Sequence, residues 1–458
     1  MALTEGQQAA FDKMMAFVDS PTGDTFCLRG GAGSGKTYLV SQFIKALVQR
    51  RDRRIVSAAP THKACRVLRS KLGAAGIPWA FKPRNDAVPG LHVVLNDTVA
   101  ALIGMRMSIT ENQDEKSEFF ESYVELVKIN KVLEGSRGGK PILIVDEASM
   151  VARDELALIK ETVDGGAKLI FVGDEGQLPP VNKEGINFET DFDSSVELTE
   201  IVRQAKDSAI IRFAYAVRRN EQITAELLQG AGIIQAASPV DWYLENLKLP
   251  VDDEGKRSVF IAFTNAWVNT VQELACQQLY GHGATTFKAG QLVLSSSSLE
   301  GKLFKEDQLR IISIEAKVDP VYGQACYLER LDVPVGASDR KFAAFYMSND
   351  VRADPTHLYN VKLREKLALA KAFQAKYNKA EPKSIERQMV DGQRRRAWTA
   401  YYEHKRSIVS FVHPFAITSH RSQGSTYETA VIHASELLQY DRRALYVAST
   451  RPSSTLVL

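Results

Sequence analysis

The sequence contains little that would mark a disulfide-rich, zinc-binding or membrane-spanning protein. Its 458 residues include only four cysteines, none of them in a Cys-x-x-Cys pair: Cys27, Cys65, Cys276 and Cys326. This spacing suggests neither a disulfide framework nor a zinc site, so we expect reduced, mostly buried thiols. No uncharged apolar run approaches the roughly 20 residues of a membrane span, and the acidic N-terminal segment does not resemble a secretory signal. The sequence therefore predicts a cytoplasmic protein.

A large excess of charge of one sign is also missing. The 58 Lys and Arg residues are nearly balanced by 55 Asp and Glu residues, which gives a formal net charge of +3. Proteins that coat nucleic acid by bulk electrostatics usually carry a large basic excess. Any charged partner must therefore be bound locally. The apolar fraction of 45% is that of an ordinary globular protein.

Short apolar runs alternate with helical patterns, which is typical of a doubly wound parallel α/β sheet. We expect strands at 25–28, 54–58, 141–145, 168–172 and 259–263. Ligands bind such sheets at the carboxyl ends of the strands. Two segments interrupt the alternation. Residues 104–131 predict an inserted hairpin, and residues from about 290 to 406 alternate like strands of a small barrel before becoming helical and basic.

A complete phosphate-binding loop follows the first of these strands. It has the spacing Gly-x-x-x-x-Gly-Lys-Thr and consists of Gly30, Gly31, Ala32, Gly33, Ser34, Gly35, Lys36 and Thr37. Glycines in such a loop let successive backbone N–H groups face the phosphates of a nucleotide. Lys36 is expected to reach the β- and γ-phosphates and Thr37 to bind a metal ion. The sequence therefore predicts that a nucleotide and Mg²⁺ bind here.

The apolar run at 142–145 ends in two adjacent carboxylates, Asp146 and Glu147. Asp146 is placed to hold Mg²⁺, directly or through water, and Glu147 to polarise the attacking water as a general base. The alternative is a helix-capping aspartate beside a surface glutamate, but the phosphate loop upstream favours the catalytic interpretation. Transfer of a γ-phosphoryl group also needs cations, for which Arg203 and Arg451 are candidates.

The motifs and their order resemble those of superfamily 1B helicases, close to the Dda and RecD-like 5′ to 3′ DNA helicases. The segments that carry the resemblance are LTEGQQAAF at 3–11, GGAGSGKT at 30–37, APTHKA at 59–64, DEAS at 146–149, GDEGQLPPV at 173–181, LTEIVRQ at 198–204, ITSHRSQGST at 417–426 and YVASTRP at 446–452. They span nearly the whole chain. The resemblance implies, at the nucleotide, an adenine-reading Gln7, a γ-phosphate sensor Gln177, the arginine fingers Arg203 and Arg451, and the phosphate contacts Gln423 and Gly424.

The resemblance also implies a track for single-stranded DNA. Its contacts would come from Thr61, His62, Thr98, Asn265, Ser419 and His420. The chain departs from the family after Thr98, where Ala100 stands in place of the usual histidine. In the inserted hairpin, Phe119 or Phe120 would act as the pin that separates the strands. Ordinary core packing is the alternative for two adjacent phenylalanines.

The implied fold is α/β, with two RecA-like doubly wound parallel-sheet domains, an inserted β-hairpin domain, and an inserted SH3-like β-barrel domain with a helical extension. The first RecA-like domain, 1A, would comprise residues 1–104 and 132–198, and the pin domain, 1B, residues 105–131. The second RecA-like domain, 2A, would comprise residues 199–292 and 407–458, and the barrel domain, 2B, residues 293–406.

The implied function is that of an ATP-dependent 5′ to 3′ DNA helicase, in which Mg-ATP hydrolysis closes and opens the two RecA-like domains. The expected partners are single-stranded DNA, duplex DNA junctions and proteins such as a single-strand binding protein or replication proteins, but no membrane. The resemblance implies a monomer that is encoded by a bacterium or a phage. Two alternatives stay open: an RNA helicase of the same superfamily, and an ATP-gated single-strand binding module without productive unwinding.

One segment departs from the balanced charge. Residues 361–406 contain 13 Lys or Arg and 5 Asp or Glu, an excess of 8, which leaves 3 − 8 = −5 for the rest of the chain. The segment is either a surface that binds the DNA backbone or a solvated helical face with an apolar seam against its own domain. We favour the second interpretation.

Overall fold

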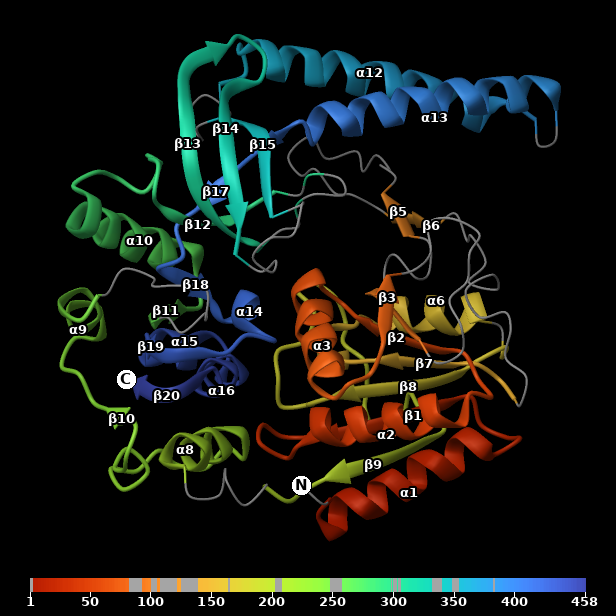
Figure 1. Cartoon of the computed structure of the whole chain (residues 1–458), viewed down its shortest axis with the longest axis vertical. Coiled ribbons are helices and arrows are strands. Elements are labelled where there is room, and N and C mark those ends of the chain that lie inside the picture. Colours follow the sequence, from red (N-terminus) through yellow and green to blue (C-terminus); the bar gives the residue numbers. More distant parts are fainter. Residues whose placement is uncertain are drawn as a thin grey trace. The chain divides into compact units, whose positions relative to one another are not determined.

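The computed structural model describes residues 3–81, 93–99, 105–107, 122–124, 139–163, 165–201, 208–247, 258–297, 299, 303, 306–331, 340–347, 354–381 and 384–458. The chain divides into two compact units, each described separately below (Figure 1). The first unit comprises Met1–Pro239, Ile261–Phe263 and Thr418–Leu458, and the second comprises Val240–Phe260 and Thr264–Ile417. Among the described helices, none has the length and apolar character that crossing a membrane requires.

A seven-stranded sheet forms the centre of the first unit, and all of its neighbouring strands are parallel. In spatial order its strands are β3 (Trp79–Phe81), β4 (Val94–Thr98), β2 (Ile55–Ala59), β7 (Ile142–Val145), β8 (Lys168–Gly173), β1 (Thr25–Gly30) and β9 (Ser194–Leu198). The strands β2, β7 and β8 are buried along their whole length. This explains why they are continuous apolar runs in the sequence.

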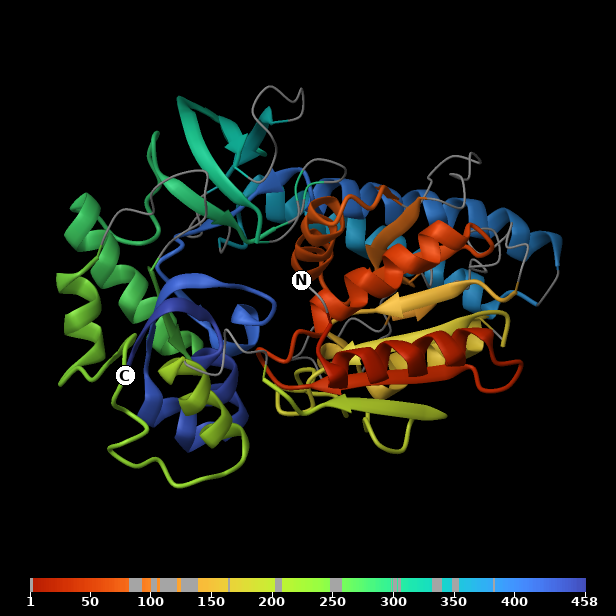
Figure 2. The same ribbon diagram turned by 60° about the horizontal axis from the view of Figure 1, so that its bottom comes forward.

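Helices cover both faces of this sheet because successive residues of a strand point to opposite sides. On β1, Phe26 and Leu28 pack into the same core as Met14 and Phe43 of the helices α1 and α2, whereas Cys27 lies in the core on the other side. The helices on the first side are α1 (Glu5–Asp19), α2 (Lys36–Arg50) and α3 (His62–Ala74), and α6 (Arg153–Val163) packs on the second (Figure 2). The sheet is therefore doubly wound, as predicted.

A second sheet has the strand order β10 (Ile233–Ile234), β20 (Pro452–Val457), β19 (Tyr427–Ile432), β11 (Ser258–Ala262) and β18 (Ala416–Thr418). Its strand β20 pairs in parallel with both β10 and β19. The neighbouring helices of the first unit are α8 (Ala209–Arg218), α14 (Ser419–Ser422), α15 (Ala434–Tyr440) and α16 (Arg442–Ser449). A short 3₁₀ helix, η1 (Ala148–Met150), follows β7. The hairpin strands β5 (Met105–Met107) and β6 (Ser122–Val124) pair antiparallel.

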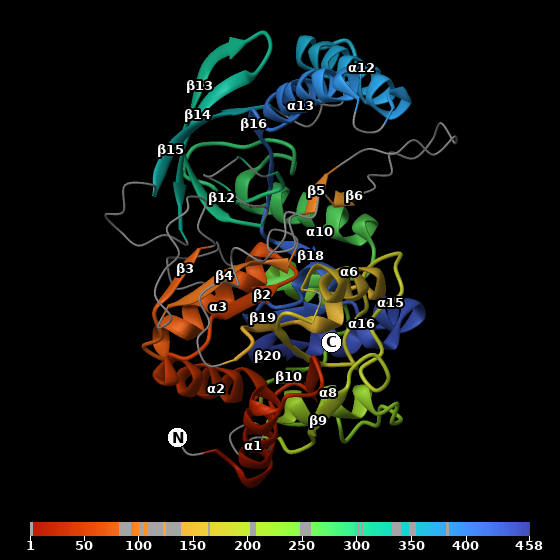
Figure 3. The ribbon, with the colours of Figure 1, turned by 90° about the vertical axis from the view of Figure 1, so that its right-hand side faces the viewer.

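The second unit contains a six-stranded mixed sheet and a helical hairpin (Figure 3). The sheet order is β16 (Ile408–Val409), β15 (Lys341–Tyr346), β14 (Gly323–Arg330), β13 (Gln308–Asp319), β12 (Leu292–Ser295) and β17 (Phe411–Val412). The helices are α9 (Pro239–Glu245), α10 (Asn265–Tyr280), α12 (Leu358–Lys379) and α13 (Ile385–Lys405). The predicted α/β fold with parallel sheets and a barrel-like insertion is confirmed. The boundaries of the four predicted domains stay a prediction.

The basic segment forms the helices α12 and α13, which pack against each other. Their seam is aromatic: Arg387 and Arg394 of α13 lie over the ring of Tyr377 of α12, at 4.4 and 4.6 Å from its centroid. Two of the arginines that made this segment basic are therefore used in its own packing. This arrangement supports the second interpretation, a solvated helical face with a seam against its own domain.

Asp193, the residue before the edge strand β9, holds the start of β1. Its carboxylate accepts hydrogen bonds from the backbone N–H groups of Asp24 and Thr25, at 2.7 and 2.9 Å. Burial alone would raise the pKa of Asp193, but the hydrogen bonds from Asp24 and Thr25 outweigh it, and the pKa is lowered. The carboxylate form therefore stabilises the fold above the unfolded-state pKa, and this contribution is lost as the pH falls through the folded-state pKa.

We expect Asp193→Ala to lower the free energy of unfolding by about 1 kcal/mol at pH 7, since the side chain is solvent-accessible. Urea unfolding at several pH values measures the effect, and the difference from the unsubstituted protein should shrink as the pH falls below about 4. Glu161→Ala, at an exposed position of α6, is the control and should change stability by less than about 0.5 kcal/mol. A pH-independent loss in Asp193→Ala would contradict the role of the carboxylate.

Candidate active site

The predicted phosphate loop connects β1 to α2, as its motif requires. Gly33 and Gly35 adopt φ angles of 75° and 78°, a left-handed conformation that glycine reaches without strain. The loop is also closely packed, because a Cβ atom on Gly31 would lie 2.5 Å from the hydroxyl oxygen of Tyr215. The backbone conformation therefore favours glycine at positions 33 and 35, and the lack of space for a side chain favours it at position 31.

Lys36 and Ser34 bond back to the loop itself. The Lys36 ammonium donates hydrogen bonds to the carbonyl oxygens of Gly30 and Gly31, at 2.6 and 3.0 Å. The Ser34 hydroxyl donates to the Gly31 carbonyl at 2.8 Å. The cation is thus held at the loop, as expected for a group that binds phosphate.

Gln7 lies next to this loop. Its side-chain nitrogen donates to the Ser34 carbonyl at 3.1 Å, and its side-chain oxygen accepts from the Thr4 amide at 3.2 Å. The second contact belongs to the capping box that begins α1. One N–H and one lone pair of the amide remain for a ligand, so the local bonds leave Gln7 able to read an adenine edge.

Asp146 and Glu147 follow β7 directly. Asp146 accepts a hydrogen bond from the Glu147 amide at 2.9 Å, and Glu147 has a φ angle of 53°, which is unusual for a residue other than glycine. Burial raises the pKa of both carboxyl groups, and the charge of Asp146 raises the pKa of Glu147 further. The positive charges of Arg451 and Lys36 act in the opposite direction on the pKa of Glu147. Perturbed pKa values of this kind are typical of catalytic carboxylates.

Residues near the C-terminus reach the same site. A Cβ atom on Gly424 would lie 3.8 Å from Glu147 Oε1 and 4.0 Å from the Ala64 side chain. The Gln423 side-chain nitrogen donates to the Leu178 carbonyl at 3.1 Å, in the motif that also contains Gln177. The side-chain oxygen of Gln177 is buried and has no hydrogen-bond partner among the described residues.

Arg451 is 7% exposed. Its guanidinium donates to the carbonyl oxygens of Val447 and Ser425, at 2.9 and 3.3 Å, and to the Thr450 hydroxyl at 2.6 Å. Burial lowers the pKa of Arg451, and the charge of Glu147 is the strongest effect in the opposite direction. The charge of the predicted general base therefore acts on this predicted arginine finger.

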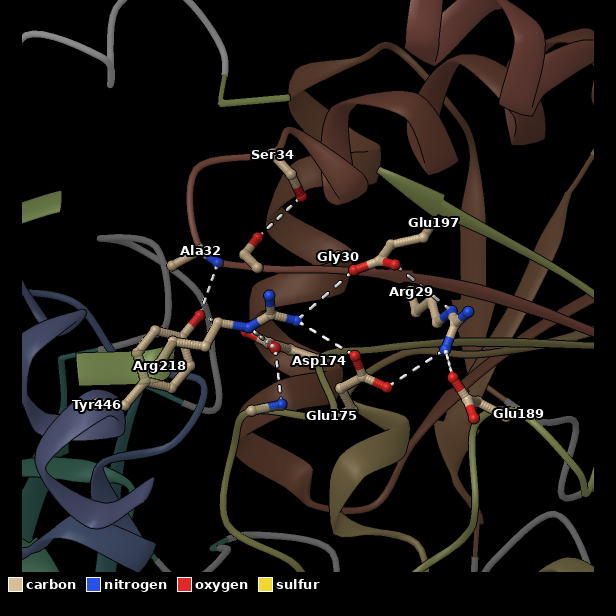
Figure 4. Close-up of polar contacts among 12 residues, drawn as sticks. Arg29, Gly30, Ala32, Ser34, Asp174, Glu175, Glu189, Glu197, Arg218 and Tyr446 are labelled. Atoms are coloured by element: carbon tan, nitrogen blue, oxygen red, sulfur yellow. Dashed lines mark hydrogen bonds and ion pairs between the residues drawn. The ribbon is translucent and has the colours of Figure 1, made fainter. Parts of the chain in front are cut away.

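A buried tyrosine joins the phosphate loop to the 173–181 motif (Figure 4). The Tyr446 hydroxyl of α16 donates to Asp174 Oδ2 at 2.5 Å and accepts from the Ala32 amide at 2.9 Å. Burial, followed by the negative charge of Asp174, raises the pKa of Tyr446. The tyrosine is therefore a neutral donor that connects two nucleotide-binding motifs.

Arginines balance the acidic groups around this contact. Arg218 of α8 pairs with Asp174 at 3.3 Å and with Glu175 at 3.6 Å, and Arg29 pairs with Glu175 at 3.4 Å. Asp174 is only 1% exposed, so its charge needs these partners. Figure 4 shows the resulting chain of ion pairs beside the loop.

Three predicted DNA contacts lie on α3 and β4. The Thr61 hydroxyl caps α3 by accepting from the Ala64 amide at 3.1 Å. His62 is the first residue of that helix, and burial lowers its pKa. Thr98, the last residue of β4, is 6% exposed. Since β2 and β4 are parallel neighbours, the segments that follow them meet at one edge of the sheet.

The other predicted contacts differ in exposure. Ser419 is completely buried, whereas its neighbour His420 is partly exposed and its ring contacts Phe263 at 5.6 Å. Asn265 is exposed at the start of α10 in the second unit. Arg203, Phe119 and Phe120 lie outside the described residues. Their roles, like the other residue assignments, stay predictions.

Sequence reasoning missed Tyr446, Asp174 and Arg218. Tyr446 and Asp174 lie inside segments that resemble family motifs, so their positions could have marked them as candidates. Arg218 belongs to no motif, and only its place at the end of α8 beside Asp174 reveals it.

A phosphate loop after the first strand of a doubly wound parallel sheet, with carboxylates on a neighbouring strand, defines a nucleotide-binding protein of the phosphate-loop class. Residues 2–239 match the model of the AAA domain family, and residues 413–458 match the UvrD-like helicase C-terminal domain. The first match covers more than half of the chain, which therefore belongs to the AAA domain family.

Three curated relatives match between 40% and 50% of the chain. An uncharacterized protein of Acanthamoeba polyphaga mimivirus is 28% identical over 229 residues, which are 49% of this chain and 43% of that protein. The ATP-dependent DNA helicase dda of Enterobacteria phage T4 is 27% identical over 237 residues, 50% of this chain and 46% of that protein. The RecBCD enzyme subunit RecD of Mycobacterium tuberculosis is 27% identical over 187 residues, 40% of this chain and 28% of that protein. The chain thus spans less than half the length of these relatives.

Among solved structures, the Pif1 helicase from Candida albicans has a TM-score of 0.54 at 17% identity, covering 100% of this chain and 94% of that chain. At this identity the likeness concerns the fold. Together with the family and relative matches, it confirms the resemblance to superfamily 1B helicases predicted from the sequence.

We expect Tyr446→Phe to lower the free energy of unfolding by about 1 to 3 kcal/mol, because it leaves a buried carboxylate oxygen and the Ala32 amide without their shared partner. Urea unfolding measures the change. Tyr215→Phe is a matched control in the same unit, since the buried Tyr215 hydroxyl has no hydrogen-bond partner among the described residues. Its removal should cost much less, and equal losses in the two variants would argue against the bridging role of Tyr446.

Proposed function

We propose that the chain is an ATP-dependent DNA helicase that moves 5′ to 3′ along single-stranded DNA and separates duplex DNA. The main support is that Lys36, Glu147 and Arg451 belong to one compact unit. The positive charges of Lys36 and Arg451 both act on the Glu147 carboxyl group. A phosphate-binding lysine, a general base and a cation for the γ-phosphate are the groups that nucleotide hydrolysis requires.

In this proposal the loop amides and Lys36 hold the phosphates of ATP, and Gln7 reads the adenine. Glu147 accepts a proton from the water that attacks the γ-phosphorus, while the bond to the β–γ bridging oxygen breaks and ADP leaves. Gln177 senses the γ-phosphate through its side-chain N–H groups, which can donate to phosphate oxygens. Arg451, with Arg203, offsets the negative charge that develops.

Thr37 and Asp146 would hold Mg²⁺. Their hydroxyl and carboxylate oxygens fit the donors that this ion prefers, and one Asp146 oxygen is already oriented by the Glu147 amide at 2.9 Å. Bound Mg²⁺ would neutralise charge on the phosphate oxygens. Burial raises the pKa of Asp146, and a cation beside the carboxylate would act in the opposite direction.

Coupling to DNA would use contacts between motifs. The Lys63 ammonium donates to the Arg421 carbonyl at 3.5 Å, which links the segment after β2 to the one after β18. His62 and His420 belong to these two segments, so their relative movement during hydrolysis would advance one DNA contact past the other. Separating one base-pair step costs on average about 1.4 kcal/mol, well within the reach of one hydrolysis cycle. The pin at Phe119 or Phe120 would keep the parted strands apart.

Lys36→Ala is expected to lower ATP hydrolysis at least about 100-fold, because the ammonium no longer neutralises the phosphates. Phosphate release in the presence of single-stranded DNA measures the loss. The control is Lys45→Ala, on the exposed side of the same helix, which should hydrolyse ATP normally. Normal turnover in Lys36→Ala would refute the assignment of the phosphate loop.

A strand-displacement assay tests substrate and polarity together. With ATP, the protein should separate DNA duplexes that carry a 5′ single-stranded tail and leave those with a 3′ tail intact. Preference for the 3′ tail would contradict the proposed direction, and displacement restricted to RNA duplexes would favour the RNA helicase. ATP-dependent binding without displacement of any duplex would favour the single-strand clamp.

A further inference from the structure

Three aromatic rings form a row in the first unit. The rings of Phe263 and Tyr440 are parallel, with an interplanar angle of 2° and centroids 4.7 Å apart. His420 meets Phe263 edge-on, at 5.6 Å. Phe263 directly follows β11, His420 is the second residue after β18, and Tyr440 ends α15. The row therefore lies where β11 and β18 end, the side on which such sheets bind ligands.

Tyr440 is not needed to pack its helix. It is 56% exposed, whereas Leu437 on the same helix is fully buried and Glu436 is 6% exposed. The buried side of α15 is thus completed by other residues. Tyr440 instead covers one side of Phe263 and leaves much of its own ring in solvent. An exposed aromatic ring that is held parallel to another is a surface on which a third flat ring can stack.

Hydrogen bonds hold this row of rings in place. The Phe263 amide donates to Glu436 Oε2 at 2.7 Å, which fastens α15 to the end of β11. The His433 amide, just before α15, donates to the Ile261 carbonyl at 3.1 Å. A stacking surface with fixed orientation loses little conformational entropy when a ligand binds.

We propose that Tyr440, backed by Phe263 and His420, is a stacking site for an unpaired nucleobase of the single strand on which the chain moves. This inference rests on the proposed function. A base within a duplex has both faces covered by its neighbours, so the site takes single-stranded nucleic acid, and it takes any base because every base offers an aromatic face. Tyr440 lies outside all of the segments that resemble family motifs.

The test uses oligothymidylate of about 15 nucleotides with one 2-aminopurine, whose fluorescence falls when it stacks on an aromatic ring. We expect Tyr440→Ala to weaken binding about 5- to 100-fold and to remove the quenching at one position of the label. Tyr440→Phe keeps the ring and should retain both. ATP hydrolysis without DNA should be unchanged in both variants.

Leu438→Ala is the matched control, because Leu438 is 40% exposed on the same helix but has no aromatic ring. It should bind the oligonucleotide like the unsubstituted protein. If Tyr440→Ala also binds with unchanged affinity and quenching, the stacking site is wrong while the helicase proposal stands. If the unsubstituted protein itself does not bind the oligonucleotide, the proposed function fails instead.

Discussion

The arrangement of the candidate site depends on one hydroxyl group. Tyr446 Oη bonds to Asp174 and to the Ala32 amide, so it ties α16 to the phosphate loop. Because Asp174 is buried, this contact and the Arg218 pair are required to compensate its charge. Arg451 follows the same helix and lies within electrostatic reach of Glu147. A helix that is fastened to the loop is thereby followed directly by the cation that acts on the predicted general base.

The parts of the site that sequence could predict are local. Gly30 to Thr37 and the pair Asp146–Glu147 each stand directly after an apolar strand, and short-range patterns of this kind determine backbone geometry by themselves. The alternation of short apolar runs with helical patterns likewise predicted a doubly wound sheet, because a strand that is buried on both faces must be apolar throughout. Only the resemblance to superfamily 1B helicases, and no local pattern, implied that Gln423, Gly424 and Arg451 lie at a nucleotide bound by the loop.

Long-range contacts could not be predicted in this way. Tyr446 and Asp174 are separated by 272 positions, and no local pattern states which buried hydroxyl meets which carboxylate. The exposure of single residues within a motif could not be predicted either. Ser419 and His420 are adjacent, yet Ser419 is completely buried, whereas the His420 ring contacts Phe263. The charge of the 361–406 segment was plain from the sequence, but only the structure shows Arg387 and Arg394 stacked on Tyr377.

The left-handed backbone at Glu147, with a φ angle of 53°, has an evolutionary consequence. A residue other than glycine loses about 1 to 2 kcal/mol in this conformation, so glycine would relax the chain at this position. Glycine has no carboxylate, however, and could not serve as the general base of the proposed hydrolysis. Under that proposal, selection for stability and selection for turnover act in opposite directions at this position, and a change to glycine in a related chain would indicate lost hydrolysis.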